Sequence, residues 1–162
     1  HTYLVRKAWI KKYNQKPTWK ECVCIFVHDL GYWGCHDMDG DEGTRHPEFG
    51  AKLARKLFKD DYYYKLCLHH SRYYAKLDKS EPSRLCWADK LGVALEPAWL
   101  YVPKARLTGE IAEYRKMAES YIMLEQSDYE WFRWIQQRFI RIAGEENGKV
   151  STRNVELSTE GR

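Results

Sequence analysis

Apolar residues recur at three- and four-residue steps at the start of the chain. A helix of 3.6 residues per turn places such positions on one face. The spacing therefore predicts a helix over residues 2–14. The residues that would share its inner face are His1, Leu4, Val5, Ala8 and Trp9.

A second helix is indicated after Pro17. Thr18 and Glu21 form the pattern of a capping box, in which hydroxyl and carboxylate satisfy the free amides of a helix start. This helix is expected to run to about Leu30, and it is apolar nearly all round, which is typical of a central helix. Residues 31–45 contain four glycines and four acidic residues, so they predict a loop.

Three further helices are predicted from their N-terminal residues. Pro47 suits the first turn of a helix that ends near Phe58. Asp60 or Asp61 caps another that runs through His69 and His70, and Ser80 with Pro82 starts the next. On this last helix the carboxylate of Asp89 shares a side with apolar positions and is expected to point inward. The apolar positions are Leu85, Ala88, Gly92 and Val93.

After Pro97 and Pro103, a helix is predicted over residues 108–124, followed by another that Ser127 and Glu130 cap. From Gly144 onward the chain is polar with few apolar residues, which indicates a mobile tail. The expected fold is all-α, a bundle of about six to eight helices. One domain is predicted over residues 1–143, with a flexible tail over 144–162.

Composition narrows the function only slightly. The net charge is +4 and is spread along the chain, which favours anionic partners weakly. Aromatic residues make up 15 per cent, so some rings are expected to line a pocket, with extra core and surface rings as an equal alternative. No apolar run reaches the length of a membrane span. The five cysteines suggest neither a disulfide framework nor a zinc ribbon, and a reduced, cytoplasmic setting fits best.

The dipeptide His28–Asp29 is the main candidate for chemistry. An apolar run over residues 23–27 leads directly into it, so an imidazole and a carboxylate are carried to a place where charge is costly. Both groups are ordinary ligands for divalent metals. Adjacent residues reach one site only where the helix end distorts, and Gly31 and Gly34 are expected to allow that distortion. The alternative is a buried, hydrogen-bonded pair.

The remaining histidines strengthen the metal interpretation. The chain has six histidines, and with Asp89 they give the order H, HD, H, HH, D. This order resembles the HD-domain superfamily of metal-dependent phosphohydrolases, in particular its members with extra histidines and two metals. The resemblance covers residues 1 to about 95. The segments that carry it are HTYLVRKAW, VHDLG, HPEFGA, LHHSR and ADKL.

The resemblance implies a two-metal centre of Mn, Fe, Co or Zn. The ligands that it implies are His1, His28, Asp29, His46, His69 and Asp89. Asp29 would bridge the two ions and act as a catalytic residue. Periodicity barely separates His69 from His70, and the family strings favour His69, which leaves His70 for the substrate or a third ion. His36 fits no part of the pattern and is expected to be solvated.

The same resemblance implies hydrolysis of a phosphoester or phosphoanhydride, with a nucleotide as the expected small-molecule substrate, by attack of a metal-bridging hydroxide on phosphorus. Arg72 and Lys90 are the candidate catalytic cations, and Arg45 is a candidate for binding phosphate. Surface solvation is the alternative explanation for each of them separately. Tyr32 and Trp33 are candidates for stacking on a base or sugar. Tyr32 stands where many HD proteins have lysine, which weakens any mechanism that needs that lysine.

Two other functions remain open. HD-fold proteins with a mixed-valence di-iron centre oxidise small polyols or aminophosphonates and use the same ligand order. A metal-stabilised protein that binds single-stranded nucleic acid through basic and aromatic residues is the third possibility, although it is not favoured.

The acidic loop also suggests calcium, because four of its carboxylates follow the register of a calcium-binding loop. They are Asp37, Asp39, Asp41 and Glu48. Glu42 replaces the glycine that the register needs, so a lid or rim over the metal centre, or a solvated turn, is expected instead.

Overall fold

The computed structural model describes residues 1–36, 40–107, 111 and 126–159, and within them it contains helices and no strand. The predicted all-α class is confirmed. The helices are α1 (Thr2–Tyr13), α2 (Trp19–Val27), the short 3-10 helix η1 (Leu30–Tyr32), α3 (Asp41–Thr44), α4 (His46–Phe58), α5 (Asp61–Leu68), α6 (Arg72–Leu77), α7 (Arg84–Ala94), α8 (Ala98–Leu107) and α11 (Asp128–Thr159).

The predicted capping box at the start of α2 is present. The Thr18 hydroxyl accepts a hydrogen bond from the Glu21 amide at 3.3 Å, and the Glu21 carboxylate accepts one from the Thr18 amide at 2.7 Å. Glu21 is buried, and its second oxygen accepts a hydrogen bond from the Tyr62 hydroxyl at 3.1 Å. The same carboxylate therefore starts α2 and connects it to α5.

Other predicted starts are also present, with one shift. Asp60 caps α5 by accepting a hydrogen bond from the Tyr62 amide at 2.9 Å. At α7 the cap is Ser83 and not Ser80, because the Ser83 hydroxyl is the one that accepts from the Cys86 amide. The cap of α11 is confirmed: the Glu130 carboxylate accepts from the Ser127 amide at 2.9 Å.

Three expectations about helix extent are wrong. The helix expected to pass through both paired histidines ends at Leu68, and α6 begins separately at Arg72. The segment around Pro103 is itself helical, as α8. Helix α11 continues to Thr159 instead of ending near Gly144, although the division into a domain and a tail stays a prediction. The helix predicted over residues 108–124 lies outside the described residues, apart from residue 111.

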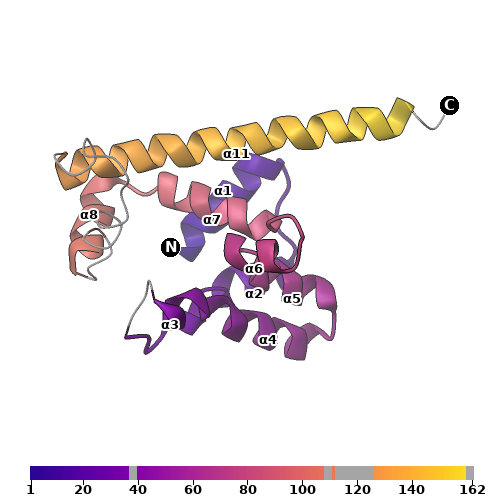
Figure 1. Cartoon of the computed structure of the whole chain (residues 1–162), viewed down its shortest axis with the longest axis horizontal. Helices are drawn as coiled ribbons and strands as arrows, with labels where there is room; N and C mark the ends of the chain where they lie inside the picture. Colours follow the sequence, from indigo (N-terminus) through magenta and orange to yellow (C-terminus); the bar gives the residue numbers. More distant parts are fainter. Residues whose placement is uncertain (37–39, 108–110, 112–125, 160–162) are drawn as a thin grey trace.

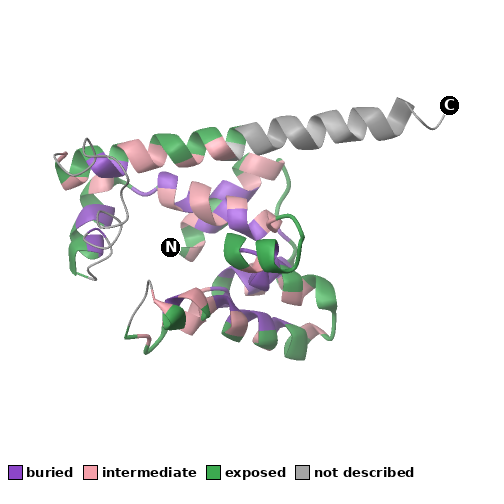
Figure 2. Cartoon of the chain, in the orientation of Figure 1, coloured by how far each residue is buried: buried purple, intermediate pink, exposed green. Residues whose placement is uncertain are grey.

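The helices are arranged around two apolar cores. In Figure 1, α2, α4 and α5 pack together on one side, α1 and α7 pair in the middle, and α11 lies along α7 on the other side. Figure 2 shows that the buried residues concentrate where these helices face one another. The larger core joins α1, α2, α4, α5 and α7, and includes Trp9, Ile25 and Leu85. A smaller core joins α8 to α11 through Tyr101 and Phe132.

Close packing of α4 against α2 depends on Gly50. A Cβ at this position would lie 2.5 Å from the carbonyl oxygen of Val27 and 3.0 Å from the Cα of His28. A side chain there would push α4 away from the end of α2. The absence of a side chain at Gly50 thus allows α4 to lie directly against the end of α2, next to His28.

A membrane span would need a long apolar helix. Among the described residues, no helix has the length and apolar character to cross a bilayer.

Candidate metal centre

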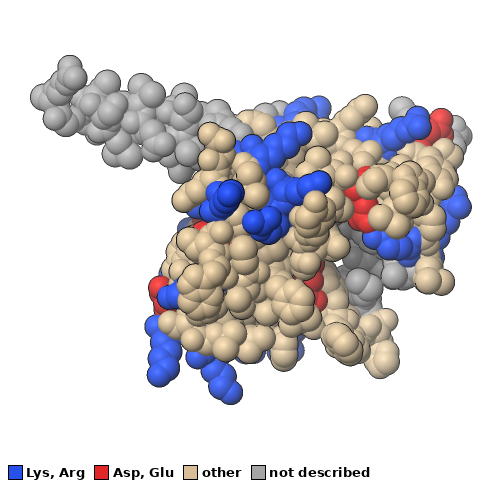
Figure 3. Space-filling view, turned by 180° about the vertical axis from the view of Figure 1, so that it is seen from behind, with Lys and Arg blue, Asp and Glu red and all other residues tan. Residues whose placement is uncertain are grey.

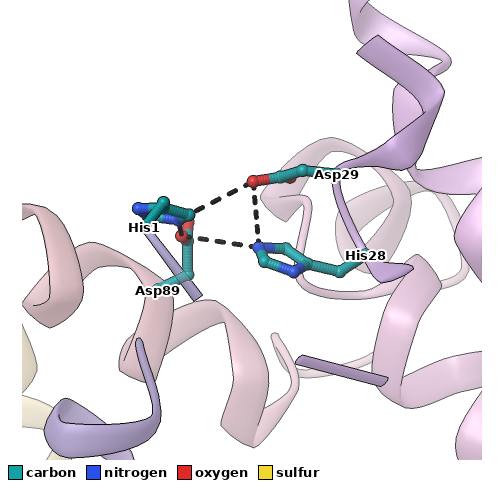
Figure 4. A group of neighbouring side chains, drawn as sticks. All are labelled: His1, His28, Asp29 and Asp89. Atoms are coloured by element: carbon teal, nitrogen blue, oxygen red, sulfur yellow. Dashed lines mark hydrogen bonds and ion pairs between the residues drawn. The ribbon is translucent and has the colours of Figure 1, made fainter. Parts of the chain in front are cut away.

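Four side chains from three parts of the chain converge on one point (Figure 4). Each offers a ligand atom, and these atoms lie within 4.8 Å of one another. His1 Nε2 is 2.7 Å from Asp89 Oδ1, and His28 Nε2 is 3.0 Å from Asp29 Oδ2. The two pairs face each other: His28 Nε2 is 3.6 Å from Asp89 Oδ1, and His1 Nε2 is 3.7 Å from Asp29 Oδ2. This is the predicted first ligand group.

Two features bring these side chains together. One is the packing of α1 on α7, and the other is the backbone conformation at the end of α2. His1 precedes the first residue of α1 and Asp89 lies on α7, so the contact between the two helices joins them. His28 keeps helical backbone angles, but Asp29 departs from them with φ −99° and ψ 4°, and the chain tightens into η1. Because of this change in the backbone, the adjacent residues His28 and Asp29 can both face the centre, as the sequence interpretation expected.

A second group shares Asp29 with the first. It contains Asp29, His46 and His70. Asp29 Oδ1 lies 3.6 Å from His46 Nε2 and 3.4 Å from His70 Nε2, whereas Oδ2 faces His28. Each oxygen of one carboxylate thus serves a different group, which is the arrangement of a carboxylate that bridges two cations.

The three inner histidines are oriented in the same way. His28, His46 and His70 each place Nδ1 against the backbone carbonyl three residues earlier, at 2.8, 2.5 and 2.5 Å. A carbonyl only accepts hydrogen bonds, so Nδ1 carries the proton and Nε2 is left to face the centre. Metal-binding histidines characteristically have their second nitrogen held in this way.

The buried Nε2 atom of His28 indicates whether the side chains of this centre fit a cation. His28 is fully buried, and its Nε2 has no partner in hydrogen-bonding geometry, although Asp29 Oδ2 is 3.0 Å away. A buried polar atom without a partner is costly and rare. A divalent ion with nitrogen and carboxylate ligands would satisfy this atom and both carboxylates, so the donor set fits such an ion.

The histidines of the two ligand groups differ in pKa. Burial opposes the charged form of His28, but the carboxylates of Asp29 and Asp89 outweigh it and raise the pKa of His28 to about 10. Burial and the neighbouring His70 lower the pKa of His46 to about 4. The pKa values of both carboxyl groups are held below their usual range, against the effect of burial, by contacts with the histidines. The centre thus keeps its acids ionised.

The structure does not bring His69, the histidine favoured as a second-group ligand, into the group around Asp29. His69 points away from Asp29: its Nε2 is 2.8 Å from Asp78 Oδ2 and its Nδ1 is 3.1 Å from the Ser80 hydroxyl. Because the helix ends at Leu68, the two histidines leave it in different directions. His70, which the sequence interpretation had left for the substrate or a third ion, lies beside Asp29 instead.

Tyr32 has a structural partner within the centre. Its ring stacks on that of His46, with centroids 3.9 Å apart and an angle of 15° between the planes. The neighbouring Gly31 permits this approach, since a Cβ there would lie 2.0 Å from the His46 carbonyl oxygen. His46 therefore covers one face of the Tyr32 ring. That face is not available for the predicted stacking on a substrate base.

Four other residues that were predicted to act in catalysis or in substrate binding belong to neither ligand group. Lys90 follows Asp89 on α7, and its ammonium group lies 5.8 Å from the centroid of the Phe139 ring. Arg45 is exposed and paired with Glu48 at 3.2 Å. Arg72 is exposed at the start of α6, and Trp33 is 89 per cent exposed. Their roles toward a substrate stay predictions.

The acidic loop is only partly described. Asp37 and Asp39, which carry the calcium register, lie outside the described residues. Asp41 begins the short helix α3, and Glu48 accepts hydrogen bonds from Lys52 at 2.8 Å and from the Tyr74 hydroxyl at 2.7 Å. Glu48 is thus part of the α4 surface. His36 is exposed, as expected.

In comparisons with known proteins, no family model, curated protein or solved structure matches this chain.

Proposed function

We propose that this protein is a metal-dependent phosphohydrolase of the HD type that uses two divalent ions. The observation that carries the proposal is the position of Asp29, whose two oxygens face two different groups of ligands. The resemblance to the HD superfamily in the order of the ligands supports it. Residues as distant in sequence as His1 and Asp89 come within hydrogen-bonding distance of each other.

The roles of the residues follow from their positions. His1, His28 and Asp89 would hold one ion, His46 and His70 the other, and Asp29 both. When bound, such ions lower the pKa of water and offset the charge of a phosphoryl group. The protein holds the imidazoles with Nε2 directed inward and the carboxylates ionised. Lys90, next to Asp89, and Arg72, two residues after His70, would attract and orient the phosphate. A cytoplasmic setting remains part of this proposal.

A di-iron oxygenase on the same fold is the second candidate. The observation that favours it is the composition of the second group, two histidines and one carboxylate, which suits non-haem iron. The tyrosine at position 32 argues against it, because the resemblance leads one to expect lysine there in that branch.

Binding of single-stranded nucleic acid is less favoured. Figure 3 shows basic side chains at several separate places on one face, with few acidic ones among them. A groove that follows a nucleic-acid backbone needs a continuous basic track. Salt-dependent binding of oligonucleotides that survives removal of metal would be needed to support this function.

The deciding experiment combines elemental analysis of the purified protein with a screen of phosphoesters in the presence of Mn, Fe, Co or Zn. Release of phosphate or of a phosphomonoester that depends on metal and is lost in Asp29→Ala supports the proposal. Consumption of dioxygen with ferrous iron, without release of phosphate from any ester, would select the oxygenase instead.

A further inference from the structure

A small cavity adjoins the candidate metal centre between α7, α8 and α11. It has a volume of about 110 Å³, and its wall includes Asp89, one of the ligands. The cavity is also lined by Lys90, Val93, Tyr101, Trp131, Ile135 and Phe139. We propose that this cavity binds the base of a pyrimidine nucleotide whose phosphate lies at the metal centre. The inference rests on the proposed hydrolase function and names its substrate class.

The position of Asp89 connects the cavity to the centre. Its Oδ1 is 2.7 Å from His1 and 3.6 Å from His28, while the same side chain forms part of the cavity wall. A ligand in the cavity is therefore next to the metal ligands. The cavity wall carries one carboxylate and one ammonium group, those of Asp89 and Lys90, so it has no excess positive charge that would draw a phosphate inside. The uncharged part of a substrate enters it, and the phosphate stays on the side of the histidines.

The walls suit a flat ring. Trp131 is 1 per cent exposed and Tyr101 is 8 per cent exposed. The Tyr101 ring is held by stacking on Phe132, with centroids 4.0 Å apart and 12° between the planes. Rigid aromatic walls favour a planar ligand, because little side-chain freedom is lost on binding. Lys90 adds one cation at the wall, near Phe139.

The volume favours one ring over two. A cavity of roughly 150 Å³ with apolar walls holds one benzene molecule. At about 110 Å³, the cavity beside Asp89 is smaller than that, so it takes at most one six-membered ring, part of which extends out of the cavity with its substituents. A purine has two fused rings and would need the walls to move apart. The geometry therefore selects pyrimidine over purine.

A larger cavity, about 410 Å³, lies beside Trp33 and Phe49 but does not adjoin either ligand group. None of the residues of the two candidate ligand groups lines it. Its two basic side chains, Arg45 and Lys52, are both paired with Glu48. It offers neither a free cation pair for phosphate nor contact with the centre, so the smaller cavity is the better substrate site.

The test uses uridine and adenosine as probes, because nucleosides carry no phosphate and are not hydrolysed by a phosphohydrolase. Each is titrated into the full chain as purified and followed by NMR of the protein. Uridine is expected to bind more tightly than adenosine, and Phe139→Ala to weaken uridine binding roughly tenfold through loss of an aromatic wall. Phe49→Ala, in the larger cavity, is the matched control and should leave binding unchanged.

A second variant covers the case in which removal of Phe139 disturbs α11. Val93→Phe fills the cavity from α7 and should abolish uridine binding, with an unchanged circular dichroism spectrum as the check on folding. Equal binding of uridine and adenosine, or unchanged uridine binding in both cavity variants, overturns the inference. Uridine binding without hydrolysis of any phosphoester would instead remove the proposed function and leave the cavity assignment standing. Hydrolysis of phosphoesters with no preference for pyrimidine nucleotides would overturn the cavity assignment and leave the proposed function standing.

Discussion

The Nε2 atoms of His46 and His70 lie 3.0 Å apart, although each ring gives its Nδ1 proton to a backbone carbonyl. Two neutral rings held in this way present lone pairs to each other, which is unfavourable. Either a proton or a cation between the rings removes the repulsion. Because the pKa of His46 is lowered to about 4, this ring is neutral near pH 7, and a metal ion is well suited to the position.

The two neighbouring histidines give the first prediction. His70→Ala removes a ligand of the second group and is expected to reduce bound metal by about one ion per chain. His69→Ala removes hydrogen bonds to Asp78 and Ser80 and should keep all the metal while lowering stability by about 1 kcal/mol. Elemental analysis and thermal unfolding measure the two effects. A larger loss of metal in His69→Ala than in His70→Ala would show the assignment to be inverted.

The sequence could predict most of the site but not the choice between these histidines. His28, Asp29 and Asp89 were identifiable because charged groups followed apolar runs or shared a face with apolar residues. For His69 and His70 the decision depends on where α5 ends. Helix ends are set by tertiary contacts as much as by local residues, and a shift of one residue turns a side chain by about 100°.

In the fold, too, local features could be predicted from the sequence, whereas features that depend on tertiary contacts could not. Caps at Thr18, Asp60 and Ser127 were predicted because the hydrogen bonds of a cap are local. Helix α8 was missed because Pro103 normally ends a helix, and nothing local indicates that packing against α11 stabilises it. The cavity beside Asp89 brings together α7, α8 and α11, so no single stretch of sequence contains its signal.

The second prediction concerns protons. At pH 7 and without metal, His28 is protonated because its pKa is raised to about 10, whereas His46 is neutral. A metal ion needs the lone pair of His28, so binding of the first ion should release at least about one proton. Calorimetric titration with Zn in buffers of different ionisation enthalpy measures this number.

The raised pKa of His28 also determines how metal affinity changes with pH. Since protons compete with metal for His28, affinity should rise with pH up to about 10 and fall as the solution becomes more acidic. Titrations at pH 6 and pH 8 compare the two conditions. An affinity that is independent of pH over this range would contradict a role for His28 as ligand.

The third prediction tests the close approach of α4 to α2. Gly50→Ala places a Cβ 2.5 Å from the Val27 carbonyl oxygen, so the helices must separate, at a cost of about 1–3 kcal/mol. The displacement also moves His46 relative to His28 and should lower metal affinity. Thermal unfolding and metal titration check both effects. Gly144→Ala is the control, because a Cβ there meets no neighbouring element within 4 Å; it should leave metal affinity unchanged and, since alanine favours a helix, should not lower stability.

The fourth prediction follows from the shared carboxylate. Asp29→Ala removes the residue that the two candidate ligand groups share and is expected to abolish hydrolysis and most metal binding, with helical content retained. Asp61→Ala, a half-exposed position on α5 that pairs with Arg55, is the matched control and should keep metal and activity. Metal analysis, circular dichroism and phosphoester hydrolysis are measured for both. Normal turnover in Asp29→Ala would exclude the proposed site.

The last prediction concerns the number of ions, on which the proposed chemistry depends. His1, His28, Asp29 and Asp89 suffice for one ion, so His46 and His70 would be surplus in a mononuclear site. Two largely buried imidazoles with Nε2 atoms 3.0 Å apart are costly unless a second cation lies between them and Asp29. Wild-type protein is therefore expected to bind two ions, and His46→Ala to keep about one while losing most hydrolysis.

Tyr32→Leu separates the loss of a ligand from the loss of its support. This variant removes the ring that stacks on His46 but leaves His46 itself, so it should keep both ions at reduced affinity and retain part of the activity. Metal content and kcat are measured for the two variants side by side under saturating metal. One ion in the wild type, or near-normal kcat in His46→Ala, would show a mononuclear centre. In that case a proton would have to stabilise the contact between His46 and His70.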